Sequence, residues 1–404
     1  MGEVYGNLGL YSRAHTLLTQ AVEIRHRVLG PKDLQTLTSM DHLAWILSQE
    51  GHYAEAEKLQ RETLDARRRI LGVKHPDTLE SMSNLGWTLN RETHYEEAEQ
   101  LQRETLDARQ RVLGPEHSDT LVSMTDLAAS MNGQGNFAEA EKLERQALDI
   151  QRRVLGPEHP RTLTSLNNLA NTLNQEDKYP EAEKLQREVL DIQGRVLGPE
   201  HPDTMKSMIN LALTLNQERH YTDAEKLERA AFEIGRRILG PEHPYTLSAM
   251  NNLVNTLNEQ HRYADAEKLG RKTLEIRRRV LGPEHRSTLM SMANLAASLR
   301  GERRCADAEK LGRETLGIQR RLLGREHPDT ADSTYNLAIT EVCENKHDEA
   351  LILLREAIEH GLPLDESLAI ETEPDFKPLH ADPRFLALVA ETKKRAAAAT
   401  VKSN

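Results

Sequence analysis

The sequence has few aromatic residues, only two cysteines and no long apolar run. Aromatic residues make up 4% and hydrophobic residues 38% of its 404 residues, which is too lean for one large globular core. The cysteines, Cys305 and Cys343, provide neither a disulfide framework nor the ligand spacing of a zinc site. Their scarcity is consistent with a reducing compartment. Because the sequence contains no stretch of about 18 apolar residues and no charged-then-apolar leader, we expect a cytoplasmic protein without a membrane partner.

The sequence also lacks an excess of positive charge. Its 53 lysines and arginines are outnumbered by 64 aspartates and glutamates, which gives a formal net charge of −11. Proteins that bind nucleic acid generally present a concentrated basic face, so we expect no nucleic-acid partner. No nucleophile–base pair, glycine-rich phosphate loop or carboxylate dyad stands out from the sequence. We therefore predict that the protein is not an enzyme and uses no cofactor.

What the sequence does contain is a strict internal period. The segment "LGPEHP" and close variants of it recur along the chain, and their glycines are spaced 42 residues apart: Gly30, Gly72, Gly114, Gly156, Gly198, Gly240, Gly282 and Gly324. A period of this length indicates an array of one supersecondary unit, in which each copy packs only against its neighbours. We therefore expect one solenoid rather than several globular domains.

Each period contains two segments with the apolar spacing of a helix. In one copy, the leucines within residues 163–173 form a single stripe on a first helix, called helix A below. After the break "QEDKYP", apolar residues within 182–196 follow at intervals of three and four and predict a second helix, helix B. Arginines gather near the end of helix B, as at residues 67–69, where positive charge suits the helix dipole. We interpret them as part of a solvated outer face rather than as a basic binding patch.

The "LGPEHP" segment is predicted to connect successive helix pairs. Gly156 can adopt the left-handed conformation that ends a helix, and Pro157 cannot continue that helix. Aspartates placed just before the next helix are candidate N-caps: Asp77, Asp119, Asp203 and Asp329. The histidine of each connector could be read as a metal ligand or a base, but no second ligand type accompanies it at short spacing. We predict that these histidines bond to nearby backbone and that the protein has no metal site.

The residues at the packing positions carry a family resemblance. Alanine occupies one position of helix B in every copy, an aromatic residue usually precedes it by three positions, and Leu-Ala or Leu-Gly lies ten positions earlier, as with Leu85, Tyr95 and Ala98. This order resembles the tetratricopeptide repeat, and the 42-residue period resembles the long form in kinesin light chains. WD40 blades have a similar period, but the helical spacing argues against strands, and HEAT repeats lack the Tyr/Ala pair. The resemblance implies an all-α fold, a right-handed superhelical solenoid of antiparallel helix pairs.

The resemblance also implies the domain organisation. Residues 1–361 form about nine repeats, of which the first is truncated, and residues 362–404 form a C-terminal capping segment and tail. The tail, which contains "DPRF", is similar to the tail of bacterial tetratricopeptide proteins. A last helix over about residues 383–397 should fold back as a cap with Phe385, Leu386, Leu388 and Val389 on its apolar face. The truncated first repeat should leave a sticky N-terminal edge, which could support self-association.

The resemblance places helices A on the concave surface of the superhelix. An asparagine just before the Leu-Ala pair is then expected to contact the backbone of a bound peptide, and a second row of amides follows six residues later. Such rows could bind any peptide main chain, or they could brace adjacent helices. Trp45 and Trp87 share one helix A position and are either binding anchors or cover for the groove floor. The candidate peptide-binding residues are Trp45, Trp87, Asn84, Asn90, Asn168, Asn171, Asn174, Asn210, Asn216, Asn252, Asn255, Asn258 and Asn294.

These features predict a non-catalytic protein–protein interaction scaffold that binds an extended peptide or a partner helix in its concave groove. The alternative is the regulatory or sensor portion of a larger or split signalling protein, of the serine/threonine kinase or nucleotide-binding receptor type. No kinase or P-loop motif occurs in the sequence, so neither activity transfers to this chain.

Overall fold

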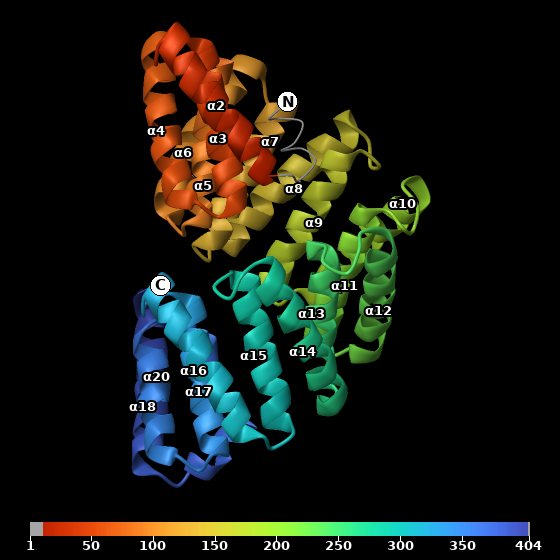
Figure 1. The fold of residues 1–404 in the computed structure, drawn as a ribbon, viewed down its shortest axis with the longest axis vertical. Coiled ribbons are helices and arrows are strands. Elements are labelled where there is room, and N and C mark those ends of the chain that lie inside the picture. The colour runs from red at the N-terminus through yellow and green to blue at the C-terminus, as the bar shows by residue number, and fades with distance from the viewer. Residues whose placement is uncertain (1–10, 403–404) are drawn as a thin grey trace. The chain divides into compact units, whose positions relative to one another are not determined.

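A computed structural model describes residues 11–402, and every regular element in this range is a helix (Figure 1). Helices A are α3 (Leu34–Glu50), α5 (Pro76–Arg91), α7 (Ser118–Gly133), α9 (Pro160–Gln175), α11 (Pro202–Gln217), α13 (Pro244–Glu259), α15 (Arg286–Gly301) and α17 (Pro328–Cys343). Helices B are α2 (Tyr11–Leu29), α4 (Tyr53–Ile70), α6 (Tyr95–Leu113), α8 (Phe137–Val154), α10 (Tyr179–Val196), α12 (Tyr221–Ile238), α14 (Tyr263–Val280), α16 (Cys305–Leu322) and α18 (His347–Glu359). The predicted all-α fold of paired helices is confirmed. The predicted truncated helix A falls on residues 1–10 and lies outside the described residues.

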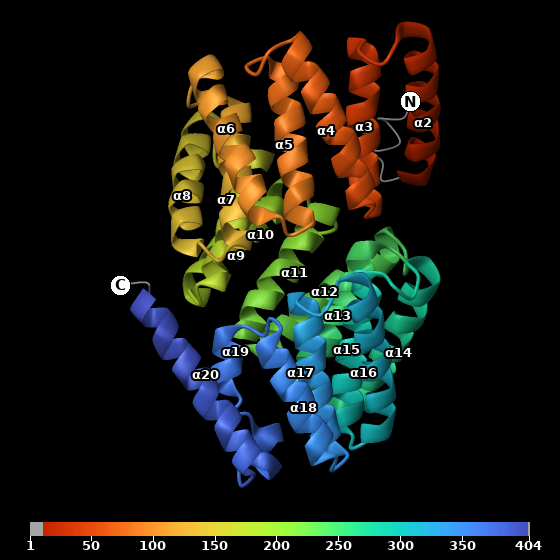
Figure 2. The same ribbon diagram turned by 90° about the vertical axis from the view of Figure 1, so that its left-hand side faces the viewer.

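The helices form two compact units, Met1–Val196 and Leu197–Asn404. The boundary falls in the connector between α10 and α11 and does not interrupt the 42-residue period. From α2 to α10 in the first unit and from α11 to α18 in the second, each helix packs against its neighbours in sequence (Figures 1 and 2). Each unit therefore has a row of small cores, which is how an array buries apolar surface with few aromatic residues.

The core of one repeat shows why the packing positions carry small residues. Ala98 of α6 is fully buried in a cluster with Leu79, Met82 and Leu85 of α5. At Gly86, which follows Leu85, an added Cβ would overlap the side chain of Gln102 on α6. The recurring alanine and the Leu-Gly or Leu-Ala pair thus mark the places where helices A and B approach most closely.

The connectors have the expected helix stop but an unexpected helix start. The connector glycines have positive φ, for example 94° at Gly156, a conformation that favours glycine. The next helix is capped by the histidine, because Nδ1 of His75 accepts a hydrogen bond from the backbone N–H of Asp77 at 3.2 Å. The prediction of aspartate N-caps at these connectors is wrong, since one residue, usually proline, separates histidine from aspartate and places the latter inside the helix. The prediction that these histidines bond to nearby backbone is confirmed.

Arginines of helices B form ion pairs along the outer face, as expected of a solvated surface. Arg61 lies 2.6 Å from Glu57 on its own helix and 2.7 Å from Glu97 on the next helix B. Arg67 departs from the prediction: its side chain is buried, pairs with Asp41 and donates to Ser81 Oγ at 2.8 Å. The reason is its place on the same helix stripe as buried Leu64, three residues earlier.

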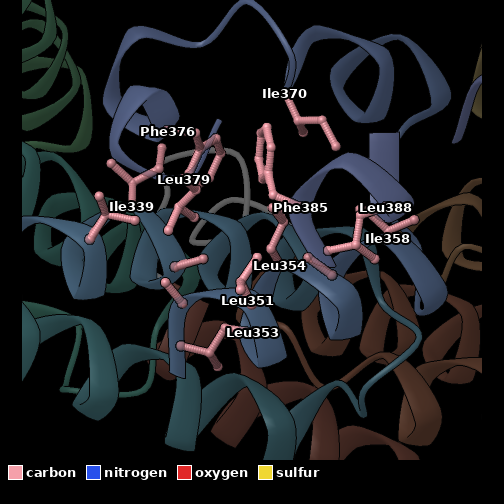
Figure 3. Close-up of a cluster of buried hydrophobic side chains, with 14 of the residues drawn as sticks. Ile339, Leu351, Leu353, Leu354, Ile358, Ile370, Phe376, Leu379, Phe385 and Leu388 are labelled. Carbon is pink, nitrogen blue, oxygen red and sulfur yellow. The ribbon is translucent and has the colours of Figure 1, made fainter. Parts of the chain in front are cut away.

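The C-terminal segment closes the second unit. It contains α19 (Leu364–Ala369), the 3-10 helix η1 (Pro374–Leu379) and α20 (Pro383–Lys402), which packs on α18 and α19. Phe376 and Phe385 are almost completely buried together with Leu379, Leu388 and Ile339 (Figure 3). Leu386 is 54% exposed, contrary to the prediction, because residues 385, 388 and 389 already form the buried stripe of α20.

Ile339 shows what this segment covers. It occupies the position in α17 that Trp45 and Trp87 occupy in α3 and α5. Tyr335, one turn earlier, contacts the ring of Phe376 edge-on with centroids 5.6 Å apart. In the second unit, η1 therefore packs on the last helix A at the position that was predicted to face the groove.

Cys305 and Cys343 form a disulfide between α16 and α17, with their Cα atoms 5.8 Å apart. The low cysteine count predicts no disulfide framework, but the repeat brings these two positions together. At the equivalent positions of the preceding copy, a Cβ added to Gly301 would overlap the ring of Tyr263, so that pair is in close contact. The disulfide thus takes the place of a tyrosine–glycine contact.

Candidate functional site

Successive helices A contact one another within each unit. In the first unit α3 contacts α5, α5 contacts α7 and α7 contacts α9, and in the second unit the same holds from α11 through α13 and α15 to α17. Each unit therefore has a continuous inner layer of helices A. The side chains of this layer that point away from helices B form the candidate binding surface.

The second row of amides ties these helices together. Nδ2 of Asn90 donates to Ser130 Oγ at 2.9 Å, that of Asn132 to Thr172 Oγ1 at 2.7 Å, and that of Asn216 to Thr256 Oγ1 at 2.8 Å. The remaining members of the row are also partnered: Ser48 with Thr88, Asn258 with Ser298, and Asn174, which is half-buried. In this row, the structure favours the bracing role that was the alternative to peptide binding.

Buried carboxylates of helices B join this bracing row. Glu228 is fully buried, accepts from Thr256 Oγ1 at 2.7 Å and from Asn216 Nδ2 at 3.2 Å, and its pKa is raised to about 7 by burial, against the effect of these hydrogen bonds. Glu144 occupies the same repeat position in the first unit, and burial raises its pKa to about 7 as well. Other copies carry glutamine at this position, as at Gln102 and Gln186.

The first row of asparagines has a different environment. Asn84 and Asn168 in the first unit, and Asn210 and Asn252 in the second, are half-buried, and their side-chain amides make no hydrogen bond to any residue within 11–402. Asn294 and Asn336 are exceptions, since the amide of Asn294 donates to the carbonyl of Asn251 at 3.4 Å and that of Asn336 to the carbonyl of Asp332 at 3.0 Å. The first row therefore keeps most of its hydrogen-bonding capacity.

A third set of positions lies three residues after the first row. Asn171 in the first unit and Asn255 in the second are exposed, and Leu213 between them in sequence is 44% exposed. These residues share the helix A position of Trp45 and Trp87. Leu213 was missed from the sequence, although the 42-residue spacing from Trp87 through Asn171 was a signal that could have identified it.

The two tryptophans differ in their surroundings. Trp87 is 37% exposed, and the Arg91 guanidinium lies over its ring, 5.6 Å from the centroid, while also donating to Tyr53 Oη at 3.2 Å. Trp45 is less exposed: it is half-buried, and its ring packs edge to face against Tyr11 with the ring centroids 6.3 Å apart. Trp87 therefore resembles an available anchor, whereas Trp45 also contributes to the core of its own repeat.

One group in the first unit has side chains that could hold a cation. Ligand atoms of Glu57, Glu92 and His94 all lie within 4.8 Å of one another. None of these residues belongs to the asparagine rows. Among the described residues, no helix is long and apolar enough to cross a membrane.

Comparison with family models identifies the repeat. Models described as "Tetratricopeptide repeat" match residues 1–34 and 36–77, and then residues 90–153, 127–193, 161–235, 215–279, 245–320 and 287–360. These matches cover most of the chain. A search of the curated proteins finds no match.

Three solved structures are similar to this chain. The nearly identical TPR-like repeats of a Podosopora anserina kinesin light chain are 28% identical, with a TM-score of 0.44 over 50% of this chain and 95% of that chain. A tetratricopeptide repeat protein from Parabacteroides merdae is 15% identical, with a TM-score of 0.50 over 78% and 98%. Human IFIT1 is 15% identical, with a TM-score of 0.54 over 97% of this chain and 84% of that chain. The last two likenesses concern the fold alone.

Proposed function

Because the chain belongs to the tetratricopeptide repeat family, whose members are generally protein-interaction scaffolds, we propose that it binds an extended peptide or a partner helix on the inner surface of its helices A. The observation that carries this proposal is that the side-chain amides of Asn84, Asn168, Asn210 and Asn252 have no hydrogen-bond partner in the described part of the chain. Asparagine is a poor helix former. In these four copies its side chain makes no hydrogen bond within residues 11–402, beside a row that does brace the helices, and this favours an external partner.

The chemistry of this row suits a peptide main chain. Each amide offers donors and an acceptor, which can pair with a backbone C=O and N–H irrespective of the side chains of the ligand. In the first unit, Trp87 adds a flat apolar surface that the Arg91 guanidinium holds in place, and tryptophan is a frequent anchor of protein interfaces. In the second unit, Leu213 and Asn255 offer a smaller apolar and polar pair. We infer a binding role rather than a catalytic one.

The test uses peptides selected from a random-sequence display library on the full chain. The affinity of a selected peptide is then measured by fluorescence anisotropy for the wild type, for N84A/N168A and for N210A/N252A. Each lost amide contact should weaken binding by about threefold to tenfold, the equivalent of one hydrogen bond. Trp87 offers a second readout: in W45F it is the one remaining tryptophan, so its emission should change when a peptide docks on the first unit.

The matched control is N136A. Asn136 precedes α8, is exposed, and its side chain makes no capping hydrogen bond, so its removal should leave both binding and circular dichroism unchanged. Equal affinity of the wild type and both double variants, with intact helix content, would refute the assignment to the first row. Failure of the library to yield any specific peptide would count against the proposal as a whole.

A further inference from the structure

A group of three side chains recurs where each helix A ends and the next helix B begins. It consists of a glutamate on the preceding helix B, the residue that caps the end of helix A, and the residue that comes two positions later. One copy in the first unit is formed by Glu141, Glu176 and Lys178. The Lys178 ammonium lies 2.7 Å from Glu141 and 3.1 Å from Glu176. One cation thus neutralises two neighbouring carboxylates.

Two further copies preserve this balance of charge. In the second unit, Arg304 forms an ion pair with Glu267 and lies 3.9 Å from Glu302. In another copy of the first unit the capping residue is Gln134, whose amide donates to Glu99, and the third residue is the neutral Asn136. Where two carboxylates meet in these copies, a cationic side chain accompanies them.

The copy formed by Glu57, Glu92 and His94 breaks this balance. It has two carboxylates, but the third residue is a histidine, which carries no permanent charge. Oε1 of Glu57 accepts from Arg61 Nε at 2.8 Å, and Arg61 also binds Glu97. Oε2 of Glu92 is buried and has no hydrogen-bond partner among residues 11–402. Two carboxylates therefore lie close together while Oε2 of Glu92 is unpaired, so this place favours a positive occupant.

The donor set and its geometry suit a metal ion. Two carboxylate oxygens and one imidazole nitrogen are ligands that Zn²⁺ and related divalent metals accept. Metal–ligand bonds of about 2.0–2.2 Å place the ligand atoms of a tetrahedral site about 3.4 Å apart. The three ligand atoms here lie within 4.8 Å of one another, so small side-chain rotations are enough to complete the set. Glu57 and Glu92 are half-buried and His94 is exposed, which leaves access for the ion and room for a water ligand.

We propose that Glu57, Glu92 and His94 bind one divalent transition-metal ion of the Zn²⁺ class, in the place that the Lys178 ammonium takes in its own copy. The ion joins α4 to the turn between α5 and α6 and thereby fixes one helix pair against the next. The site uses none of the residues assigned to peptide binding and stands independently of that proposal.

The experiment measures uptake of Zn²⁺ by the full, chelator-treated chain with isothermal titration calorimetry, and Co²⁺ absorption as a spectroscopic readout. The wild type should bind one equivalent of Zn²⁺ more than H94K, in which a lysine stands between the two glutamates as Lys178 does in its own copy. E92Q gives this copy the glutamine that the next copy has at Gln134. This variant should bind Zn²⁺ at least tenfold more weakly than the wild type. The control H117N replaces a connector histidine with another capping residue and should keep the wild-type stoichiometry.

The variants also separate metal binding from a general stabilising effect of positive charge at position 94. Chelation of the ion should lower the thermal midpoint of the wild type, whereas H94K should be insensitive to the chelator because its lysine supplies the charge permanently. Equal stoichiometry and affinity in the wild type, H94K and E92Q would overturn the proposal. A wild type that takes up no Zn²⁺ would also overturn the proposal, even if H94K proves more stable than the wild type.

Discussion

Glu228 offers a sharp test of how the inner helices are held together. It is fully buried between α11 and α13, where Asn216 and Thr256 donate to its two oxygens. The perturbation is E228Q. Glutamine already occupies this position at Gln102 and Gln186, so its size suits the site. Thr256 Oγ1 can accept from the glutamine amide, since its own proton can turn to the carbonyl of Asn252 at 3.1 Å.

The magnitude follows from proton linkage. Burial raises the pKa of Glu228 from 4.5 to about 7, so the folded protein binds the proton more tightly than the unfolded chain. The folded state is therefore favoured most at low pH, and this contribution is lost as the pH rises from 4.5 through about 7. At about 1.4 kcal/mol for each tenfold change in proton affinity, the full loss is about 3 kcal/mol. Glutamine does not titrate and removes this dependence.

The assay is urea unfolding followed by circular dichroism at about pH 5 and about pH 8.5. E228Q and the wild type should be similarly stable at the lower pH, and E228Q should be more stable by up to about 3 kcal/mol at the higher pH. E144Q should behave in the same way in the first unit. The control is E233Q, on the exposed side of α12, which should follow the wild type. A stability difference between E228Q and the wild type that is the same at both pH values would refute the reasoning.

Three further predictions concern other parts of the fold. Reduction of the Cys305–Cys343 disulfide, which joins residues 38 positions apart, should destabilise the second unit by about 2–4 kcal/mol. The variant C305Y/C343G replaces the disulfide with the kind of contact that Tyr263 and Gly301 make, so it should unfold identically with and without reductant. F376A should lower the free energy of unfolding in urea by about 3–5 kcal/mol, because it leaves a cavity at a fully buried site. The control is L386A, on the exposed side of α20. A loss of stability in F376A no larger than in L386A would contradict the assigned packing of the C-terminal segment. T93G should raise the stability of the first unit by about 1 kcal/mol, since Thr93 has φ of 64°, and a thermal midpoint at or below that of the wild type would argue against strain at this turn.

Local physics explains which features could be read from the sequence. Helix A, helix B and their connector depend on residues close in the chain: apolar residues three and four apart, a glycine that ends one helix and a residue that caps the next. The 42-residue period repeats these local signals, so the sequence alone is enough to predict the order of the helices. The N-cap residue is not fixed by these signals, because histidine and aspartate can both accept from the first backbone N–H groups of a helix, and only the backbone geometry shows that His75 occupies this position.

The role of each asparagine in the candidate binding site depends on contacts between repeats, which the residue types alone do not reveal. Asn84 and Asn90 are the same residue type on the same helix, yet the amide of Asn90 meets Ser130 of the next helix A whereas that of Asn84 meets no partner among the described residues. A difference of six residues rotates a side chain by more than a full turn and a half, and what it then contacts is set by the neighbouring repeat.

The sequence by itself determined the repeat, its helices and the family, because these follow from short-range patterns repeated at one interval. Only the tertiary structure decided which asparagines brace and which remain available, that Arg67 lies in the core, and that Cys305 reaches Cys343. The physical reason is that packing joins residues from successive copies, about 40 positions apart, whose side chains meet only when the helices are stacked.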